Sequence, residues 1–174
     1  MRRAPTTPQS PQARVSEAPA AFAPRGLNLD GPRLQRILPH RPPFLLLDRV
    51  IDIEPGKAAR AIKCVSTNEP VLQGHFPGEP VFPAVLCIEA MAQLMCVLLY
   101  VSRSMDPSNQ RFAFAGVEKA KFRQPIVPGD RVEFTVSVVN HRSNIWKCAG
   151  QAVVDEVLCV EAELLAAIQD GDER

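Results

Sequence analysis

Several features that mark large functional classes are missing from this 174-residue chain. Its formal net charge is only +1 and charged residues make up 22% of it, so no strong electrostatic field indicates a nucleic acid or a membrane surface as partner. Histidines are scarce, with three in the whole chain, and no two cysteines form a CxxC pair. Because zinc sites need clustered thiolate and imidazole ligands, this composition argues against a metal centre.

The cysteines are odd in number and are spread through apolar segments, at Cys64, Cys87, Cys96, Cys148 and Cys159. This distribution is typical of buried thiols in the reducing cytosol rather than of a disulfide framework. We interpret Cys87 and Cys96 as core residues and not as nucleophiles. We expect a cytoplasmic protein.

The N-terminal segment also lacks the apolar core of a secretory signal. Residues 1–26 are rich in Pro, Ala, Arg, Ser and Thr, and Glu17 is their only acidic residue. Such a composition cannot offset the entropy lost on ordering, so we predict a disordered tail over residues 1–30 and one folded domain over 31–170. An organelle transit peptide is the alternative, although the prolines oppose the amphipathic helix of a mitochondrial one.

The most apolar segment runs from Ala84 to Val101, with Glu89 and Gln93 as its only strongly polar residues. Its length would allow a short membrane span, but the two polar residues near its middle favour a buried core helix. Pro83 is well placed for the first turn of that helix, which we expect to end near Ser102.

Shorter elements surround this helix. Asp30 can cap a short helix that ends near Leu38, and proline, glycine and alternating apolar residues mark the strands and turns. The last segment could also form a helix. The predicted strands are 44–53, 58–67, 111–123, 131–142, 144–154 and 157–168. A helix that is apolar almost all round must be enclosed, so we predict an α+β fold in which a curved antiparallel sheet wraps one long helix.

Two residues indicate acid–base chemistry. Glu89 lies in an apolar helix, and its burial against Val85, Ile88 and Ala92 would favour the protonated carboxylic acid. His75 lies in a loop between Gly74 and Gly78. A loop imidazole and a buried carboxyl group are the two halves of an acid–base pair.

The motifs around these residues resemble those of FabZ-type (3R)-hydroxyacyl-[acyl carrier protein] dehydratases. The likeness runs in order from about Leu34 to Ala167, and the fourteen-residue step from His75 to Glu89 is family-like too. The matching segments are Leu38–Val50, Asn68–Pro70, Gly74–Gly78, Ile88–Gln93, Phe114–Gly116 and Pro125–Asp130. The resemblance implies the hotdog fold, in which an antiparallel sheet wraps a long helix.

The resemblance also implies an activity, the dehydration of (3R)-3-hydroxyacyl-[acyl carrier protein] to the trans-2-enoyl product in fatty acid biosynthesis. It implies no cofactor, acyl carrier protein as partner, and a homodimer or trimer of dimers in which histidine and glutamate come from different chains. The related FabA branch, which also isomerises the double bond, has Asp where this chain has Glu89. A hotdog thioesterase and a non-catalytic acyl-binding homologue are the alternatives.

In the implied chemistry, His75 removes the C2 proton, Glu89 protonates the leaving hydroxyl group, and backbone N–H groups at Ala84 and Val85 hold the thioester oxygen. The family usually has Gly at position 84, and many relatives have a Tyr that gates the acyl tunnel where this chain has Ala113.

Further site residues are expected around this pair. The predicted substrate-binding residues are Phe76, Gly78, Pro83, Ala84, Val85 and Gln93. Gln93 could instead form a hydrogen-bonded pair with Glu89 that fixes the helix register. Lys119, Lys121 and Arg123 alternate along a predicted strand and so share a face, which could dock the acidic carrier protein or simply be solvated. We interpret His40 as structural.

Overall fold

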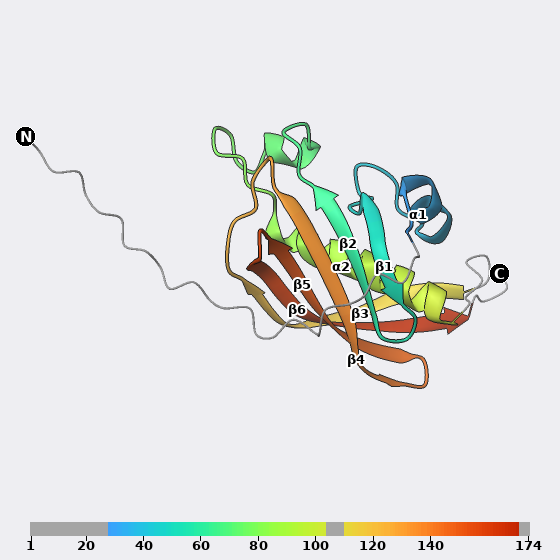
Figure 1. The fold of residues 1–174 in the computed structure, drawn as a ribbon. Helices are drawn as coiled ribbons and strands as arrows, with labels where there is room; N and C mark the ends of the chain where they lie inside the picture. Colours follow the sequence, from blue (N-terminus) through green and yellow to red (C-terminus); the bar gives the residue numbers. More distant parts are fainter. Residues whose placement is uncertain (1–27, 104–109, 171–174) are drawn as a thin grey trace, which may run out of the picture.

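The computed structural model describes residues 28–103 and 110–170, so the predicted tail lies almost wholly outside the described residues. A six-stranded antiparallel sheet with strand order β1-β2-β4-β5-β6-β3 curves around one long helix (Figure 1). This confirms the α+β prediction. The elements are α1 (Gly31–Ile37), β1 (Arg49–Glu54), β2 (Ala58–Cys64), the 3₁₀ turn η1 (Pro70–Gln73), α2 (Ala84–Arg103), β3 (Gln110–Phe122), β4 (Arg131–Arg142), β5 (Ile145–Val154) and β6 (Val157–Asp170).

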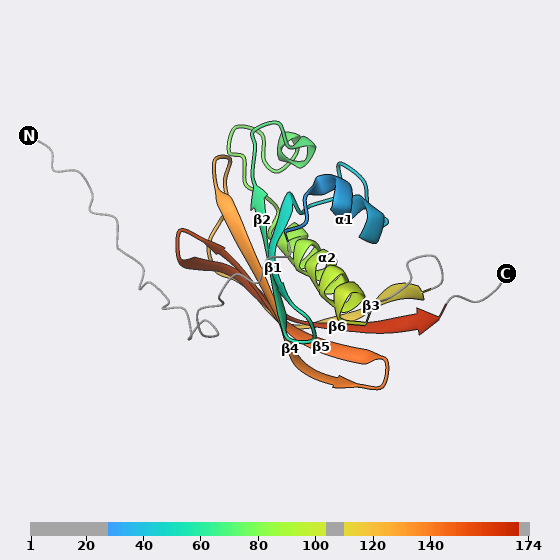
Figure 2. The ribbon, with the colours of Figure 1, turned by 45° about the vertical axis from the view of Figure 1, so that its right-hand side comes forward.

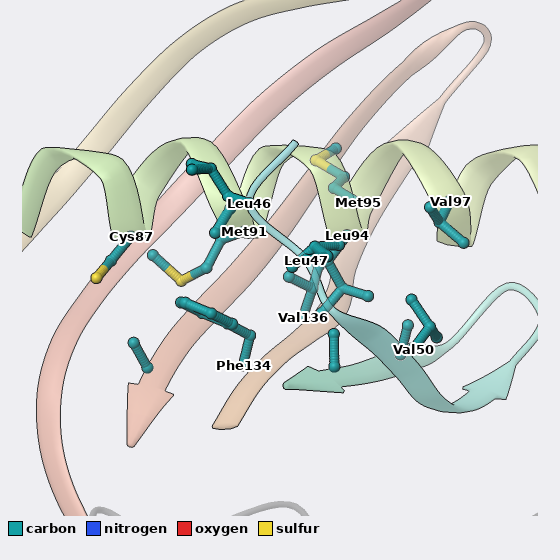
Figure 3. Close-up of a cluster of buried hydrophobic side chains, with 14 of the residues drawn as sticks. Leu46, Leu47, Val50, Cys87, Met91, Leu94, Met95, Val97, Phe134 and Val136 are labelled. Carbon is teal, nitrogen blue, oxygen red and sulfur yellow. The ribbon is translucent and has the colours of Figure 1, made fainter. Parts of the chain in front are cut away.

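Helix α2 is the centre of the hydrophobic core, enclosed by the sheet on one side and flanked by α1 on another (Figure 2). Met91 and Leu94 extend from it toward Phe134 and Val136 on β4 (Figure 3). By length and composition α2 could cross a membrane, a test that the core helix of a soluble protein also passes. Its packing against the sheet supports the interpretation as a buried helix.

Helix α2 packs closely against the sheet at Gly150 of β5. A Cβ atom at this position would lie 2.7 Å from the Met91 sulfur, closer than non-bonded atoms approach. The absent side chain therefore lets α2 sit directly on the sheet, and this contact helps set the height of the helix above β5.

The start of the described chain is attached to β1 and α1. The backbone of Leu29 exchanges two hydrogen bonds with Val50 of β1, at 3.0 and 2.9 Å. The side chain of Asp30 accepts a hydrogen bond from the Arg33 N–H and caps α1, as expected. Residues 28–30 thus contact the folded domain, and the boundary between tail and domain stays a prediction.

One predicted strand was placed too early. The segment 44–48 is not part of a strand, and β1 begins only at Arg49. Gln93 of α2 accepts a hydrogen bond from the Leu46 N–H and donates one to the Phe44 carbonyl. These backbone groups therefore bind a side chain instead of a neighbouring strand. The ambiguous C-terminal segment is a strand, β6.

Candidate active site

His75 lies in the loop between η1 and α2, and main-chain contacts fix its ring. Its Nδ1 is 2.7 Å from the Val81 carbonyl oxygen. Since a carbonyl oxygen can only accept, Nδ1 carries the hydrogen, and Nε2 is left with a free lone pair in the neutral ring. The Val81 N–H in turn donates to the His75 carbonyl at 2.9 Å. The loop therefore presents Nε2 as a potential base.

Backbone hydrogen bonds also fix the rest of this loop. Phe76 and Glu79 exchange backbone hydrogen bonds of 3.2 and 3.1 Å, and the Phe76 ring, itself 54% exposed, stacks on His75 with 4.0 Å between the centroids. Gly78 has φ +82°, a left-handed conformation that a side chain would strain. Phe76 and Gly78 thus shape the loop around the imidazole.

The beginning of α2 faces the same space as His75. Pro83, Ala84 and Val85 line a cavity of about 290 Å³ together with His75 and with Phe122 of β3. The N–H groups of the first helical turn have no acceptor within the helix and can bind a developing negative charge. Position 84 does not have a positive φ, so alanine fits there without strain and keeps its N–H.

Glu89 lies one and a half turns further along α2, and its side chain is 27% exposed. Its Oε1 accepts a hydrogen bond of 2.9 Å from Gln93 Nε2 and is 3.3 Å from His40 Nε2. Val85 is 62% exposed, so the expected burial of Glu89 against that side chain does not occur within one chain. Polar groups, rather than apolar walls alone, surround the carboxyl group.

Gln93 is only 1% exposed, and three protein partners occupy its amide. Besides Glu89 it binds the Phe44 carbonyl at 2.9 Å and the Leu46 N–H at 3.0 Å. The bond to Glu89 matches the alternative of a hydrogen-bonded pair on the helix, and a role of Gln93 in substrate binding stays a prediction. Gln93 connects Glu89 to the segment that precedes β1.

His75 and Glu89 do not share a pocket in a single chain. The cavity of His75 is lined by Ala84 and Val85 but not by Glu89. Glu89 instead contacts His40, which lines a separate cavity.

Comparisons with known proteins place this architecture in a family. The FabA-like domain matches residues 38–163. The chain belongs to the FabA-like domain family. It is 49% identical over 146 residues to the 3-hydroxyacyl-[acyl-carrier-protein] dehydratase FabZ of Campylobacter concisus, covering 82% of this chain and 99% of that protein. It is 46% identical over 144 residues to FabZ of Myxococcus xanthus, covering 83% and 94%.

Solved structures share the fold of this chain. The dehydratase heterocomplex ApeI:P from Xenorhabdus doucetiae matches with a TM-score of 0.64 and 19% identity, covering 77% of this chain and 89% of that one. A hot-dog-like protein from Thermanaerovibrio acidaminovorans matches with a TM-score of 0.56 and 21% identity, covering 68% and 84%. The predicted hotdog fold is confirmed.

The two cysteines of α2 keep their protons near neutral pH. Burial raises the pKa of Cys87 to about 12. Burial, and to a lesser degree the charge of Glu89, raises the pKa of Cys96 to about 12. A thiol must lose its proton to act as a nucleophile, so these values support the interpretation of both residues as core residues.

The basic residues proposed for docking are each paired with a glutamate on β6. Lys119 Nζ is 2.8 Å from Glu163, and Lys121 and Arg123 both contact Glu161, at 3.3 and 2.5 Å. The β3–β6 register shifts between Glu118 and Lys121, so the expected strict alternation is interrupted. Local pairing reduces the charge that these three residues can offer a partner.

Sequence reasoning did not find the contact between His40 and Glu89. The motif Leu38–Val50 included the histidine, but we favoured a structural role for that residue over a catalytic one. No local periodicity connects two residues in separate segments of the chain, and the contact forms only when the segment 39–48 folds over α2.

Proposed function

We propose that this protein is a 3-hydroxyacyl-[acyl-carrier-protein] dehydratase, a hydro-lyase of fatty acid biosynthesis that forms trans-2-enoyl products from (3R)-3-hydroxyacyl chains. Curated relatives with this name are 46–50% identical to it over 94–99% of their own length. The structural observation that carries the chemistry is a pair of oriented groups, the His75 imidazole with Nε2 free and the Glu89 carboxyl group held by Gln93.

His75 is the base in this proposal. Its Nε2 takes the proton from C2 of the substrate, and the Val81 carbonyl bonded to Nδ1 stabilises the imidazolium that results. The electron pair of the broken C2–H bond moves toward the thioester carbonyl. Backbone N–H groups of Ala84 and Val85 supply the positive end of a helix to the oxygen on which negative charge develops.

Glu89 is the acid. Hydroxide is a poor leaving group, so the C3–O bond breaks as the Glu89 carboxylic acid transfers its proton to that oxygen and water departs. The electron pair from C2 forms the C2–C3 double bond. The carboxylate and the imidazolium left behind return to their starting state by transfer of one proton, so each turnover yields one enoyl thioester and one water.

We place the substrate's hydrocarbon chain in a cavity of about 500 Å³ next to His40, which is the neighbour of Glu89. Cys96, Tyr100 and Phe112 also line this cavity.

The pair is completed by a second copy of the chain. β3 is an edge strand of the described sheet, and Phe114 and Val117 are exposed on it. Its Phe122 lines the cavity of His75, whereas its Phe112 lines the cavity of His40. Antiparallel pairing of two β3 edges about a twofold axis would bring the His75 end of one chain to the His40–Glu89 end of the other.

Mixed dimers test both the activity and this arrangement. Chains with His75→Ala or Glu89→Ala alone should lose roughly a thousandfold in kcat. Heterodimers of the two variants, purified through two different tags, should regain about half of the wild-type activity, because one of their two sites is intact. No recovery would show that the pair lies within one chain.

The reaction itself is tested with crotonyl thioester. Hydration removes the absorbance of the conjugated enoyl group, whereas hydrolysis would release free thiol. We expect loss of absorbance without thiol release, and the opposite result would identify a thioesterase and contradict the proposal.

The carrier protein is expected to dock beside the His75 entrance, where Lys121 and Arg123 flank Phe122. Replacing both with alanine should raise KM for a carrier-protein substrate and leave KM for a small N-acetylcysteamine thioester unchanged. The effect is expected to be small, since Glu161 already neutralises part of this charge. Equal effects on both substrates would contradict docking at this place.

The assembly and location are proposed from the same features. We propose a homodimer as the minimum active unit and a trimer of dimers as the assembly, which analytical ultracentrifugation can measure. All five cysteines are free thiols, which supports a reducing, cytosolic location.

A further inference from the structure

We propose that His40 is a positioning residue for the acid: together with Gln93 it fixes Glu89 so that the proton to be transferred sits on Oε2. The inference rests on the proposed role of Glu89 and adds to it the atom that delivers the proton and the side chain that selects that atom.

The two neighbouring nitrogens converge on one oxygen. Gln93 Nε2 donates to Glu89 Oε1 at 2.9 Å, and His40 Nε2 lies 3.3 Å from the same oxygen. Hydrogen bonds at active sites are often long without substrate and shorten when it binds. An oxygen that receives two N–H groups is the carbonyl oxygen of a carboxylic acid, so the hydrogen of the protonated acid belongs on Oε2.

The tautomer of His40 follows from its burial. The Nδ1 atom of His40 is buried and has no hydrogen-bond partner among the described residues. A buried N–H without an acceptor is costly, so in the neutral ring the hydrogen is better placed on Nε2, which faces Glu89. His40 therefore acts as a hydrogen-bond donor and takes no part in the proton balance of the reaction.

The neighbouring arginine holds His40 in this place. Arg41 Nη1 donates to the carbonyl oxygens of Leu38 and His40 at 2.9 and 2.7 Å, and its Nη2 donates to Gln35 at 3.1 Å. These bonds attach the segment that contains His40 to α1. Gln93 binds the carbonyl of Phe44 in the same segment, so hydrogen bonds fix this segment, and with it the position of His40, at both ends.

In the reaction, the bond between hydrogen and Glu89 Oε2 breaks as that hydrogen joins the leaving hydroxyl oxygen. The carboxylate that remains keeps the N–H of Gln93 and that of His40 on Oε1. Without His40 the carboxyl group can rotate and carry its hydrogen on the oxygen that faces away from the substrate. A displacement of a reacting group by about 1 Å can reduce the rate by about a hundredfold.

The test compares His40→Gln with His40→Asn. The Gln amide nitrogen can reach the position of imidazole Nε2, whereas the shorter Asn amide reaches only that of Nδ1. We expect His40→Asn to lower kcat roughly tenfold to a hundredfold with KM nearly unchanged, and His40→Gln to restore most of kcat. His141→Asn, at an exposed ring stacked on Trp146, is the matched control and should not change kcat.

Two results would overturn the inference. One is an equal loss of kcat in the Gln and Asn variants. The other comes from ¹⁵N NMR of the histidines in the wild-type protein, which is informative even if a variant fails to fold. We expect the His40 hydrogen on Nε2, and a hydrogen on Nδ1 would contradict the proposal.

Failure of the proposed function would look different. In that case Glu89→Gln would keep its dehydratase activity. If Glu89 is the acid and His40 acts only through it, His40→Asn should cost nothing further in a Glu89→Gln background. An additional loss of the residual activity there would show that His40 acts elsewhere.

Discussion

The two halves of the proposed acid–base pair are held in contrasting ways. His75 lies on a loop, and its ring and backbone are fixed by the main chain of Val81. Glu89 lies on the central helix, and its carboxyl group is surrounded by two other side chains, those of Gln93 and His40. The base thus depends on a backbone conformation, and the acid depends on particular residues.

This contrast has a physical reason. A general base needs one free lone pair, and a single carbonyl bonded to the opposite ring nitrogen is enough to fix the tautomer. A carboxylic acid has two similar oxygens, so directing its proton requires donors that distinguish them. We therefore expect substitutions around Glu89 to impair catalysis more than substitutions around His75, provided that the loop backbone is kept.

The largest expected effect comes from Gln93→Leu. It removes a donor to Glu89 and also leaves the Leu46 N–H and the Phe44 carbonyl without their partner, and a buried unpaired group costs about 1–3 kcal/mol. We expect a lower midpoint of urea unfolding together with a large loss of kcat. Unchanged kcat in a folded variant would show that Glu89 does not need this amide.

An intermediate effect is expected from Gly150→Ala. The new Cβ would meet the Met91 sulfur at 2.7 Å, and such overpacking typically costs about 1–3 kcal/mol. Because the acid is attached to α2, a shift of the helix should lower kcat and reduce thermal stability. Combining Gly150→Ala with Met91→Ala, which makes room, should restore kcat if displacement of the helix is the cause.

The smallest effect is expected from Val81→Ala. The carbonyl oxygen that binds His75 Nδ1 belongs to the backbone, so shortening the side chain leaves that hydrogen bond in place. We expect kcat within about threefold of wild type, since only side-chain packing is lost. A loss as large as that of Gln93→Leu would remove the distinction between the two halves of the site.

Much of the site could be predicted from local patterns. The apolar segment after Pro83 indicated α2 nearly to its observed ends, and Asp30 indicated the cap of α1. The motif around His75 identified the loop. Helix periodicity and turn residues act over a few positions, so these features can be read without knowing the rest of the fold.

Other features depended on distant parts of the chain. The strand expected from residue 44 begins only at Arg49, because Gln93, 47 residues from Leu46, takes the backbone bonds of that segment. Lys121 and Arg123 form ion pairs with Glu161 only because β6 lies beside β3 in the sheet. No spacing in the sequence indicates either contact.

The amino-acid sequence by itself determined the chemistry of this protein, an imidazole and a carboxyl group on an apolar helix, since these depend on residue type and short-range order. Only the tertiary structure decided the orientation of these two side chains. It brought His40 and Gln93 to the same oxygen of Glu89 and set the His75 ring against the Val81 carbonyl, because the direction of a side chain is set by neighbours that the folded chain brings together.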